Sequence, residues 1–340
     1  MRVSRATIPA MIQPARGLVL SLSVFLFPFM ALAQPAAAPQ KWALAIHGGA
    51  GTIPKNLPEE QKQRYLKSLT SALEIGRDVL KSGGTSLDAV EKVVRFLEDD
   101  PLFNAGKGAV YTHEGTHELD AAIMDGRDLS CGSVASLKTV RHPISLARLV
   151  KEKSPHVFLV GEGAEAFATE MKVERVKNDW FDTPVRYQQL QEALQEEQKS
   201  KPGKKDKDTV GAVALDTHGN LAAATSTGGL TNKRFGRLGD VPVIGAGTYA
   251  NNRTAALSAT GIGEEFIKHT VAHDISALVE YGGLTLQQAA DRVIHQKLKP
   301  GDGGVIGVGR DGSIVLVFNS EGMYRGAVDS AGRFEVKIWE

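Results

Sequence analysis

The sequence predicts an α+β protein in which helices bracket blocks of strands. Apolar residues recur at helical spacing in 58–81 and 86–98, whereas 210–215 and 221–227 are short apolar runs separated by a polar turn. Helical spacing returns at 263–280. Because the strands come in hairpin-connected groups and do not alternate one by one with helices, this order argues against a doubly wound parallel sheet.

Each element is predicted from its own pattern. The chain opens with an apolar strand at 41–46, and the helix at 86–98 carries one apolar stripe: Leu87, Val90, Val93, Val94 and Leu97. Further strands are expected at 117–124, 132–140, 210–215, 221–227, 244–249, 255–260, 304–309 and 313–318. Further helices are expected at 58–81, 143–152, 161–170, 263–280 and 284–296.

The first 33 residues are typical of an export signal. Three arginines precede an apolar run at 18–30, and Ala31-Leu32-Ala33 supplies the small-x-small pattern of a cleavage site. A membrane anchor is the alternative, but the run is shorter than the about 20 residues that span a bilayer, and Pro28 interrupts it. We therefore expect a signal peptide at 1–33, export to the periplasm and no membrane attachment after its removal.

Composition indicates an ordinary globular protein. The 340 residues are 42% hydrophobic and 23% charged, enough to bury a sizeable core. Removing residues 1–33, with their three arginines and no acids, takes the net charge from +1 to −2, so nothing favours nucleic-acid binding. The single cysteine, Cys131, cannot form an intramolecular disulfide.

Thr209 stands where a charged segment ends and an apolar strand begins, in Asp208-Thr209-Val210-Gly211. A hydroxyl nucleophile needs a base, and a threonine at a chain terminus carries one on its own nitrogen. A free α-amino group titrates near pH ~7.7–8.0 and can therefore accept a proton at neutral pH. The junction predicts cleavage between Asp208 and Thr209, which gives an alpha subunit of 34–208 and a beta subunit of 209–340 within one folded domain.

The segment before the junction has the composition of a flexible linker. Residues 186–208 are rich in Gln, Glu and Lys, contain the breaker Pro202-Gly203 and have almost no apolar residue after Leu194. Such composition does not bury enough apolar surface to stay ordered. We therefore expect a flexible linker over 186–208.

The strands on either side of His218 make a geometric prediction. Thr209 and Thr227 lie at equal distances along the chain from His218, at the centre of the predicted turn. In a regular hairpin the two threonines would face each other, with Cβ atoms roughly 4.5–5.5 Å apart. A bulge in the turn would shift this register.

Several motifs in fixed order resemble one family. They are TVGAVALDTHGNLAAATSTGGLTNKRFGRLGDVPVIGAGTYANN at 209–252, HGGAG at 47–51, PLFNAGKG at 101–108, THELDAAIMDG at 116–126 and SATGIGEEF at 258–266. Together they resemble the plant-type L-asparaginase and isoaspartyl peptidase family of self-processing N-terminal-nucleophile hydrolases. The resemblance implies a four-layer αββα sandwich with two stacked, mainly antiparallel sheets, and a threonine nucleophile.

The resemblance also implies the roles of site residues. Arg237 and Asp240 would bind the α-carboxylate and α-ammonium of the substrate, because a guanidinium and a carboxylate complement those groups, and Gly263 would offer a backbone carbonyl. The remaining implied positions are Thr227 beside the nucleophile, Thr260 and Gly261 in an oxyanion hole, and Asn104 lining the pocket. Without the resemblance, Arg237 and Asp240 read as a solvated surface pair, and the glycines as an ordinary helix cap.

The loop at 97–107 resembles the sodium-binding loop of the family. The resemblance implies that a structural sodium ion is held by the backbone carbonyls of Leu97, Glu98, Asp100, Phe103, Ala105 and Lys107. Ligation by oxygen alone suits a hard cation. An ion-free turn is the alternative.

The activity implied is hydrolysis of β-aspartyl dipeptides and L-asparagine with release of aspartate, without a catalytic cofactor. The resemblance further implies an (αβ)2 heterotetramer. Two alternatives stay open. One is glycosylasparaginase, which shares the Asp-Thr junction, and the other is an exported amino-acid-binding protein that uses Arg237 and Asp240 without chemistry.

Overall fold

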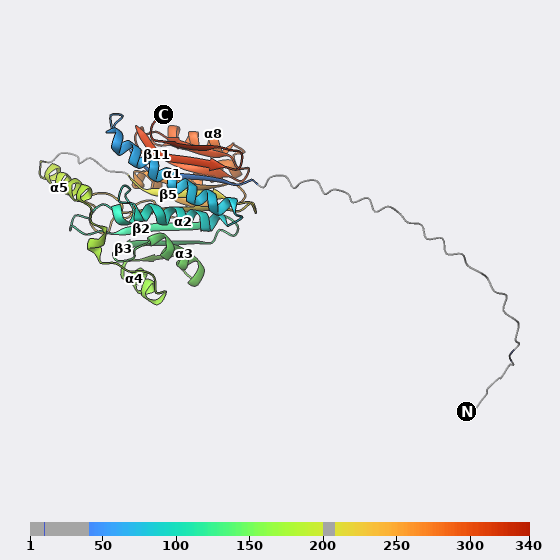
Figure 1. The fold of residues 1–340 in the computed structure, drawn as a ribbon, viewed down its shortest axis with the longest axis horizontal. Helices are drawn as coiled ribbons and strands as arrows, with labels where there is room; N and C mark the ends of the chain where they lie inside the picture. The colour runs from blue at the N-terminus through green and yellow to red at the C-terminus, as the bar shows by residue number, and fades with distance from the viewer. Residues whose placement is uncertain (1–9, 11–40, 200–207) are drawn as a thin grey trace, which may run out of the picture. The chain divides into compact units, whose positions relative to one another are not determined.

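Two stacked β-sheets form the middle of the fold, as the computed structural model of the chain shows (Figure 1). The structure describes residue 10, residues 41–199 and residues 208–340. The larger sheet has eight strands in the order β12-β11-β1-β5-β6-β2-β3-β4, and the smaller has four in the order β10-β9-β8-β7. Among the described strands all pairs are antiparallel except β3 with β4, which confirms the predicted α+β class.

The strands are β1 Ala43–Gly51, β2 Leu119–Asp125, β3 Cys131–Leu137, β4 Phe158–Val160, β5 Val210–Leu215, β6 Leu221–Thr227, β7 Thr248–Ala250, β8 Ala255–Gly261, β9 Gly303–Gly309, β10 Ile314–Phe318, β11 Gly322–Asp329 and β12 Phe334–Lys337. The α-helices are α1 Glu59–Lys81, α2 Ser86–Asp99, α3 Pro143–Lys153, α4 Gly161–Glu170, α5 Pro184–Gln198, α6 Gly263–His269, α7 Val271–Glu280 and α8 Leu286–Arg292. Short 3₁₀ turns lie at Gly106–Gly108 and Asn178–Phe181, and a π turn lies at Val293–Lys297.

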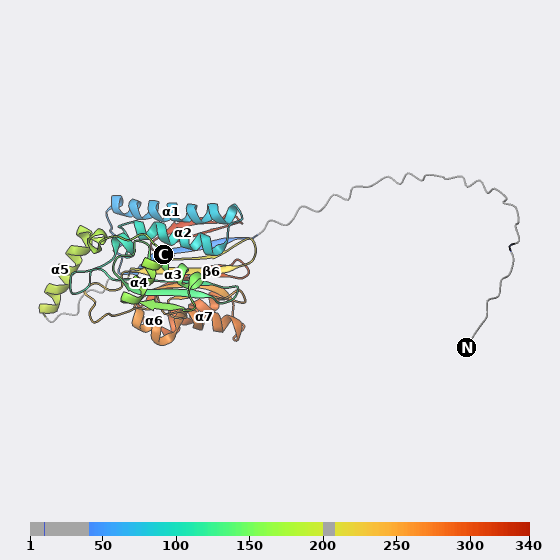
Figure 2. The same cartoon turned by 90° about the horizontal axis from the view of Figure 1, so that it is seen from below.

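Helices cover the outer face of each sheet, so the fold has four layers (Figure 2). One apolar cluster joins α1, α2 and α3 to the larger sheet, and a second joins α6, α7 and α8 to the smaller sheet. A third cluster fills the space between the sheets, where Val213 and Leu221 meet Ile306 and Val308. This is the expected αββα sandwich.

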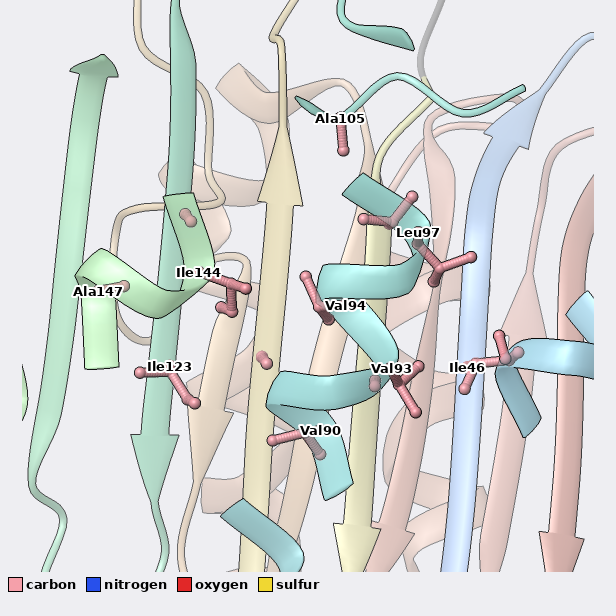
Figure 3. Packing of buried hydrophobic residues seen from close by; sticks show 14 of the residues in the cluster. Ile46, Val90, Val93, Val94, Leu97, Ala105, Ile123, Ile144 and Ala147 are labelled. Atoms are coloured by element: carbon pink, nitrogen blue, oxygen red, sulfur yellow. The ribbon is translucent and has the colours of Figure 1, made fainter. Parts of the chain in front are cut away.

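The apolar stripe predicted on α2 packs against the larger sheet. Figure 3 shows Val90, Val93, Val94 and Leu97 pointing from the helix toward the strands behind it, and all four are fully buried. Burying side chains of this size stabilises the fold by about 1.5–3 kcal/mol each. The helix begins at a Thr85 cap, whose hydroxyl accepts the backbone N–H of Asp88.

The turn between β5 and β6 fixes the register of these two strands. One side-chain oxygen of Asp216 accepts the backbone N–H groups of His218 and Asn220, and the other accepts the N–H of Ser86 at the start of α2. Leu215 therefore pairs with Leu221 without a bulge. The symmetric hairpin predicted from the sequence forms.

The flexible linker predicted at 186–208 is wrong for its first part. Residues Pro184–Gln198 form helix α5, which lies at one end of the sandwich in both overall views (Figures 1 and 2). Thr183 caps the helix, Pro184 occupies its first turn, and Gln, Glu, Leu and Ala are good helix formers. The composition that predicted disorder also suits an exposed helix. Residues 200–207, like the predicted signal peptide at 1–33 apart from residue 10, lie outside the described part of the chain.

Other differences from the predicted elements are smaller. The helix predicted at 263–280 is two helices, because Thr270 adopts a left-handed conformation with φ of 44° between α6 and α7. The strand predicted at 244–249 is reduced to β7. Strands β4, β11 and β12 were not predicted. In β11, glycines and Arg325 interrupt the apolar pattern, although the strand pairs with β1 inside the larger sheet.

Candidate active site

Thr209 lies at the entrance to β5, on the side that faces the smaller sheet. The residue is only 6% exposed, and its Oγ1 donates a hydrogen bond to Oγ1 of Thr227 at 3.1 Å. The register explains this contact, because Val210 pairs with Ser226 and the next position outward brings the two threonines opposite each other. The hairpin thus juxtaposes two hydroxyls, as its symmetry predicts.

The carbonyl group of Asp208, which precedes Thr209, accepts hydrogen bonds from two side chains. Asn104 Nδ2 donates to it at 2.9 Å, and Thr227 Oγ1 donates at 3.4 Å. Asn104 is fully buried, and its amide also contacts the Gly229 carbonyl and the Val110 N–H, which fixes its orientation. The structure therefore places Asn104 against the carbonyl of the bond predicted to break, whereas the lining of the small pocket beside Thr209 does not include Asn104, which the sequence assigned to it.

A small pocket of about 10 Å³ opens beside the two threonines. It gathers most of the residues that the sequence singled out, and its lining comprises Asp208, Thr209, Thr227, Gly229, Leu230, Arg237, Gly239, Asp240, Gly261 and Gly263. A volume of this size holds about one water molecule. In the continuous chain the pocket is assembled, but it is too small for an amino acid.

Arg237 is oriented by a carboxylate that the sequence did not single out. Its Nε and Nη2 donate to the two carboxylate oxygens of Glu264, each at 2.9 Å. A guanidinium has five N–H donors, so this fork leaves donors for a second carboxylate. Glu264 follows Gly263 and precedes another glutamate, and nothing in that run distinguishes it before the fold is known.

Asp240 is buried with one unpaired oxygen. Only 5% of the residue is exposed, and Oδ2 has no hydrogen-bond partner among the described residues. Burial raises the pKa of Asp240 to about 7, the carboxylates of Glu264 and Asp120 act in the same direction, and Arg237 opposes them. A buried, unpaired acid in a pocket is suited to bind a ligand cation. The reading of Arg237 and Asp240 as a solvated pair is therefore wrong.

Thr260 and Gly261 are the last two residues of β8. Thr260 is 1% exposed, and Gly261 lines the pocket. A Cβ on Gly261 would lie 2.2 Å from the Asp302 carbonyl oxygen and 2.6 Å from the Phe266 ring, so only glycine fits there. Close packing thus requires this glycine, whatever its backbone N–H does in catalysis.

A chain of buried hydrogen bonds holds the backbone of Thr209. His47 Nδ1 donates to the Thr209 carbonyl at 3.0 Å, and Nε2 accepts from the Ser258 hydroxyl at 2.9 Å. The Ser258 oxygen lies 2.7 Å from the Thr225 hydroxyl, which in turn accepts from Thr248. Burial lowers the pKa of His47 to about 3, so its ring is neutral and its two nitrogens have opposite roles.

The glycines of the HGGAG motif are required by close packing next to Asp208. Gly49 has φ of +115°, and a Cβ there would lie 2.9 Å from the Cα of Asp208. Gly48 would bring a Cβ within 2.4 Å of the Phe103 ring. The motif lets β1 pass close to Asp208 and to the loop after α2.

That loop suits an oxygen-bound cation. A Cβ on Gly106 would come within 2.1 Å of the Glu98 carbonyl oxygen, and one on Gly108 within 2.1 Å of the Phe103 oxygen. The glycines thus let carbonyl groups from α2 and from the loop approach the same stretch of backbone. The carbonyls of Leu97 and Asp100 each accept a long backbone hydrogen bond, from Asp100 N at 3.3 Å and from Phe103 N at 3.4 Å, which leaves a second lone pair on each oxygen. The donor set fits a hard cation.

Two features are absent from the described part of the chain. No set of three or more His, Cys, Asp or Glu side chains among them could hold a metal ion. Within 41–199 and 208–340, no helix is both long and apolar enough to pass through a bilayer.

Comparison with known proteins identifies the family. Residues 40–338 match the model of the family described as asparaginase. The chain belongs to the asparaginase family. The chain is 53% identical over 295 residues to the isoaspartyl peptidase of Salmonella typhimurium, which covers 84% of this chain and 94% of that protein.

Two further relatives give the same picture. The isoaspartyl peptidase of Escherichia coli is 50% identical over 300 residues, covering 84% of this chain and 92% of the relative. A probable isoaspartyl peptidase/L-asparaginase of Arabidopsis thaliana is 44% identical over 324 residues, covering 88% of this chain and 99% of the relative. The family predicted from the motifs is confirmed.

Proposed function

We propose that this member of the asparaginase family cleaves itself between Asp208 and Thr209 and then acts as an isoaspartyl peptidase and L-asparaginase. The observation that carries the proposal is the hydrogen bond from the Thr209 hydroxyl to Thr227, in a pocket that also contains Arg237 and Asp240. The names of the relatives support the same activity.

Self-cleavage needs a base other than the Thr209 nitrogen, which is an amide in the continuous chain. Thr227 is positioned for this step, because it accepts from the Thr209 hydroxyl and donates to the Asp208 carbonyl. As Thr209 Oγ1 attacks the carbonyl carbon, its proton passes to Thr227, whose own proton moves to the carbonyl oxygen. Asn104 stabilises the charge that develops there. Breaking the C–N bond, with proton transfer to nitrogen, leaves an ester that water hydrolyses.

Turnover then uses the free amine of Thr209. Arg237 binds the substrate α-carboxylate, while Asp240 and the Gly263 carbonyl bind the α-ammonium. Thr209 Oγ1 attacks the side-chain carbonyl, its amine takes the hydroxyl proton and gives it to the leaving nitrogen, and water hydrolyses the ester to release aspartate. The Thr260 hydroxyl and the Gly261 N–H stabilise the oxyanion.

We also propose a sodium ion in the loop after α2. The carbonyls of Leu97, Glu98, Asp100, Phe103, Ala105 and Lys107 would hold it, and its charge would stabilise the loop that carries Asn104. Export after removal of 1–33, a periplasmic location and an (αβ)2 assembly complete the proposal, on the export pattern and the family resemblance.

One experiment separates this function from its rivals. Purified protein is run on a denaturing gel, its chains are sequenced from their N-termini, and it is offered β-aspartyl-leucine, L-asparagine and a glycosylated asparagine. We expect two chains, one beginning Thr-Val-Gly-Ala, and hydrolysis of the first two compounds. Preference for the glycosylated compound indicates a glycosylasparaginase. An intact chain that binds asparagine without hydrolysing it overturns the proposal in favour of a binding protein.

A further inference from the structure

A second pocket, of about 690 Å³, lies on the other side of Asp208. It is bounded by the start of α1, the loop after α2 and the first turn of α5. Asp208 lines both this pocket and the small pocket beside Thr209. Asp208 therefore separates the two pockets, and the pockets would join if Asp208 moved away after cleavage.

A buried arginine, Arg186, contacts Asp208. Arg186 is only 4% exposed, and its Nη2 lies 3.7 Å from Oδ2 of Asp208. The remaining donors are fixed by α5 and the loop, because Nε donates to the Gly108 carbonyl at 2.8 Å and Nη1 to Gln189 at 3.0 Å. The guanidinium thus keeps its position while its carboxylate partner belongs to the residue that leaves.

Among the described residues, the charges that line the second pocket balance only while Asp208 is present. Its cationic lining residues are Arg64, Lys107 and Arg186, and its acidic ones are Glu60, Asp182 and Asp208. When Asp208 leaves, one cation is uncompensated. A buried charge without a partner carries a larger free-energy cost than an exposed one, so the buried Arg186 gains most from a new carboxylate partner.

Catalytic chemistry places the leaving group at the same spot. The leaving nitrogen of a substrate must lie within hydrogen-bond reach of the Thr209 amine, which protonates it. In the continuous chain, the Thr209 nitrogen is bonded to the carbonyl carbon of Asp208, so Asp208 occupies the space next to this nitrogen. The residue attached to the leaving nitrogen therefore extends into the space that Asp208 vacates.

We infer that the pocket beyond Asp208 is the subsite for the leaving residue of a β-aspartyl peptide, and that Arg186 binds the free α-carboxylate of that residue. The inference rests on the proposed function and narrows its substrate class to β-aspartyl dipeptides that end in a free carboxylate. The Asp208 side chain occupies this place until self-cleavage.

The test compares two substrates that differ only in this charge. Cleaved enzyme is assayed with β-aspartyl-leucine, with β-aspartyl-leucinamide and with L-asparagine as a reference. We expect kcat/KM for the free acid to exceed that for the amide by about 10-fold or more, because a buried guanidinium discriminates strongly between a carboxylate and a neutral amide. Equal values for acid and amide, in an enzyme that hydrolyses asparagine, overturn the subsite alone. A protein that neither cleaves itself nor hydrolyses asparagine overturns the proposed function and the subsite with it.

Substitutions of Arg186 test whether this side chain causes the preference for the free acid over the amide. In Arg186→Gln we expect the acid-to-amide ratio to fall toward 1, and in Arg186→Lys, which keeps the charge, to remain well above 1. Arg77→Gln is the matched control, because Arg77 lies on α1 outside the pocket and contacts Asp78. If Arg186→Gln does not cleave itself, the lysine variant and the wild-type comparison still decide. An unchanged ratio in a cleaved Arg186→Gln enzyme contradicts the assignment.

Discussion

The layer between the two sheets has an apolar end and a polar end, and the same strands build both. In β5, Val213 and Leu215 lie in the apolar cluster between the sheets, whereas Thr209, the residue just before this strand, lies at the site. On β6, Leu221 belongs to the apolar end and Thr227 to the polar one. Alternate residues of a strand share a face, so each strand changes from apolar to polar along one face.

The interactions at the polar end depend on direction, and those at the apolar end do not. Apolar burial stabilises the fold without fixing hydrogen-bond geometry, whereas each buried hydroxyl at the polar end needs a partner. The partners form a connected chain through His47, Ser258 and Thr225 to Thr248. The polar end therefore determines where Thr209 stands, and the apolar end determines whether the sheets stay together.

The sharpest test of this division compares Thr209, just before β5, with Leu215 at the other end of that strand. Thr209→Ala removes the proposed nucleophile, so we expect one uncut chain and a loss of hydrolysis of about 10⁴-fold or more. Leu215→Ala, on the same strand face, should reduce the free energy of unfolding by about 2–5 kcal/mol and leave self-cleavage intact. Denaturing gels, substrate assays and urea unfolding measure the three effects. Cleavage of Thr209→Ala at the same bond would contradict the comparison.

Asn104 tests whether the polar end acts on the scissile bond. In Asn104→Ala the Asp208 carbonyl loses its shorter hydrogen bond, and we expect self-cleavage to slow by about 10²–10³-fold, measured as the half-time for conversion of one chain into two. Asn178→Ala is the matched control, because Asn178 also donates to two backbone carbonyls but lies away from the junction. Equal slowing in both variants would show that the effect is structural.

Much of this division could be predicted from the sequence. The Asp-Thr junction and the symmetric spacing around His218 are local patterns, whereas Arg237 and Asp240 were assigned by the family resemblance. The structure brings Asp208, Thr209, Thr227, Arg237 and Asp240 to one pocket. A hairpin is a local element, so equal spacing along the chain translates directly into register.

What could not be predicted depends on contacts between distant segments. Ser258 and Glu264 act through partners up to 211 positions away, and no local pattern separates them from other polar residues. Helix α5 was missed for a different reason. Its Gln- and Glu-rich composition suits an exposed helix as well as a disordered chain, and only the Thr183 cap and the buried Arg186 decide for the helix.

The buried Asp240 makes the polar end sensitive to pH. With its pKa raised to about 7, Asp240 loses its charge as the pH falls below that value, and it then binds an ammonium group less well. We expect the affinity of the cleaved enzyme for L-aspartate to fall by about tenfold per pH unit between pH 7 and 5, a range in which carboxyl groups of ordinary pKa stay ionised. Inhibition constants measured across this range test it. In Asp240→Asn the affinity should be lower and nearly independent of pH, and an unchanged pH dependence would assign the titration to another group.

We expect the smallest effects from two substitutions on β8, one that places a polar side chain at the apolar end and one that places an apolar side chain at the polar end. On β8, Ala256 lies in the apolar cluster and Ser258 in the hydrogen-bond chain, two positions apart on the same face. Ala256→Ser buries a hydroxyl among apolar side chains, and Ser258→Ala leaves His47 Nε2 without its donor, so each should lower the free energy of unfolding by about 1–3 kcal/mol. Only Ser258→Ala should also slow turnover, because only it loosens the support of Thr209. If urea unfolding and asparagine assays showed the same loss of activity in both variants, the two ends would not be functionally distinct.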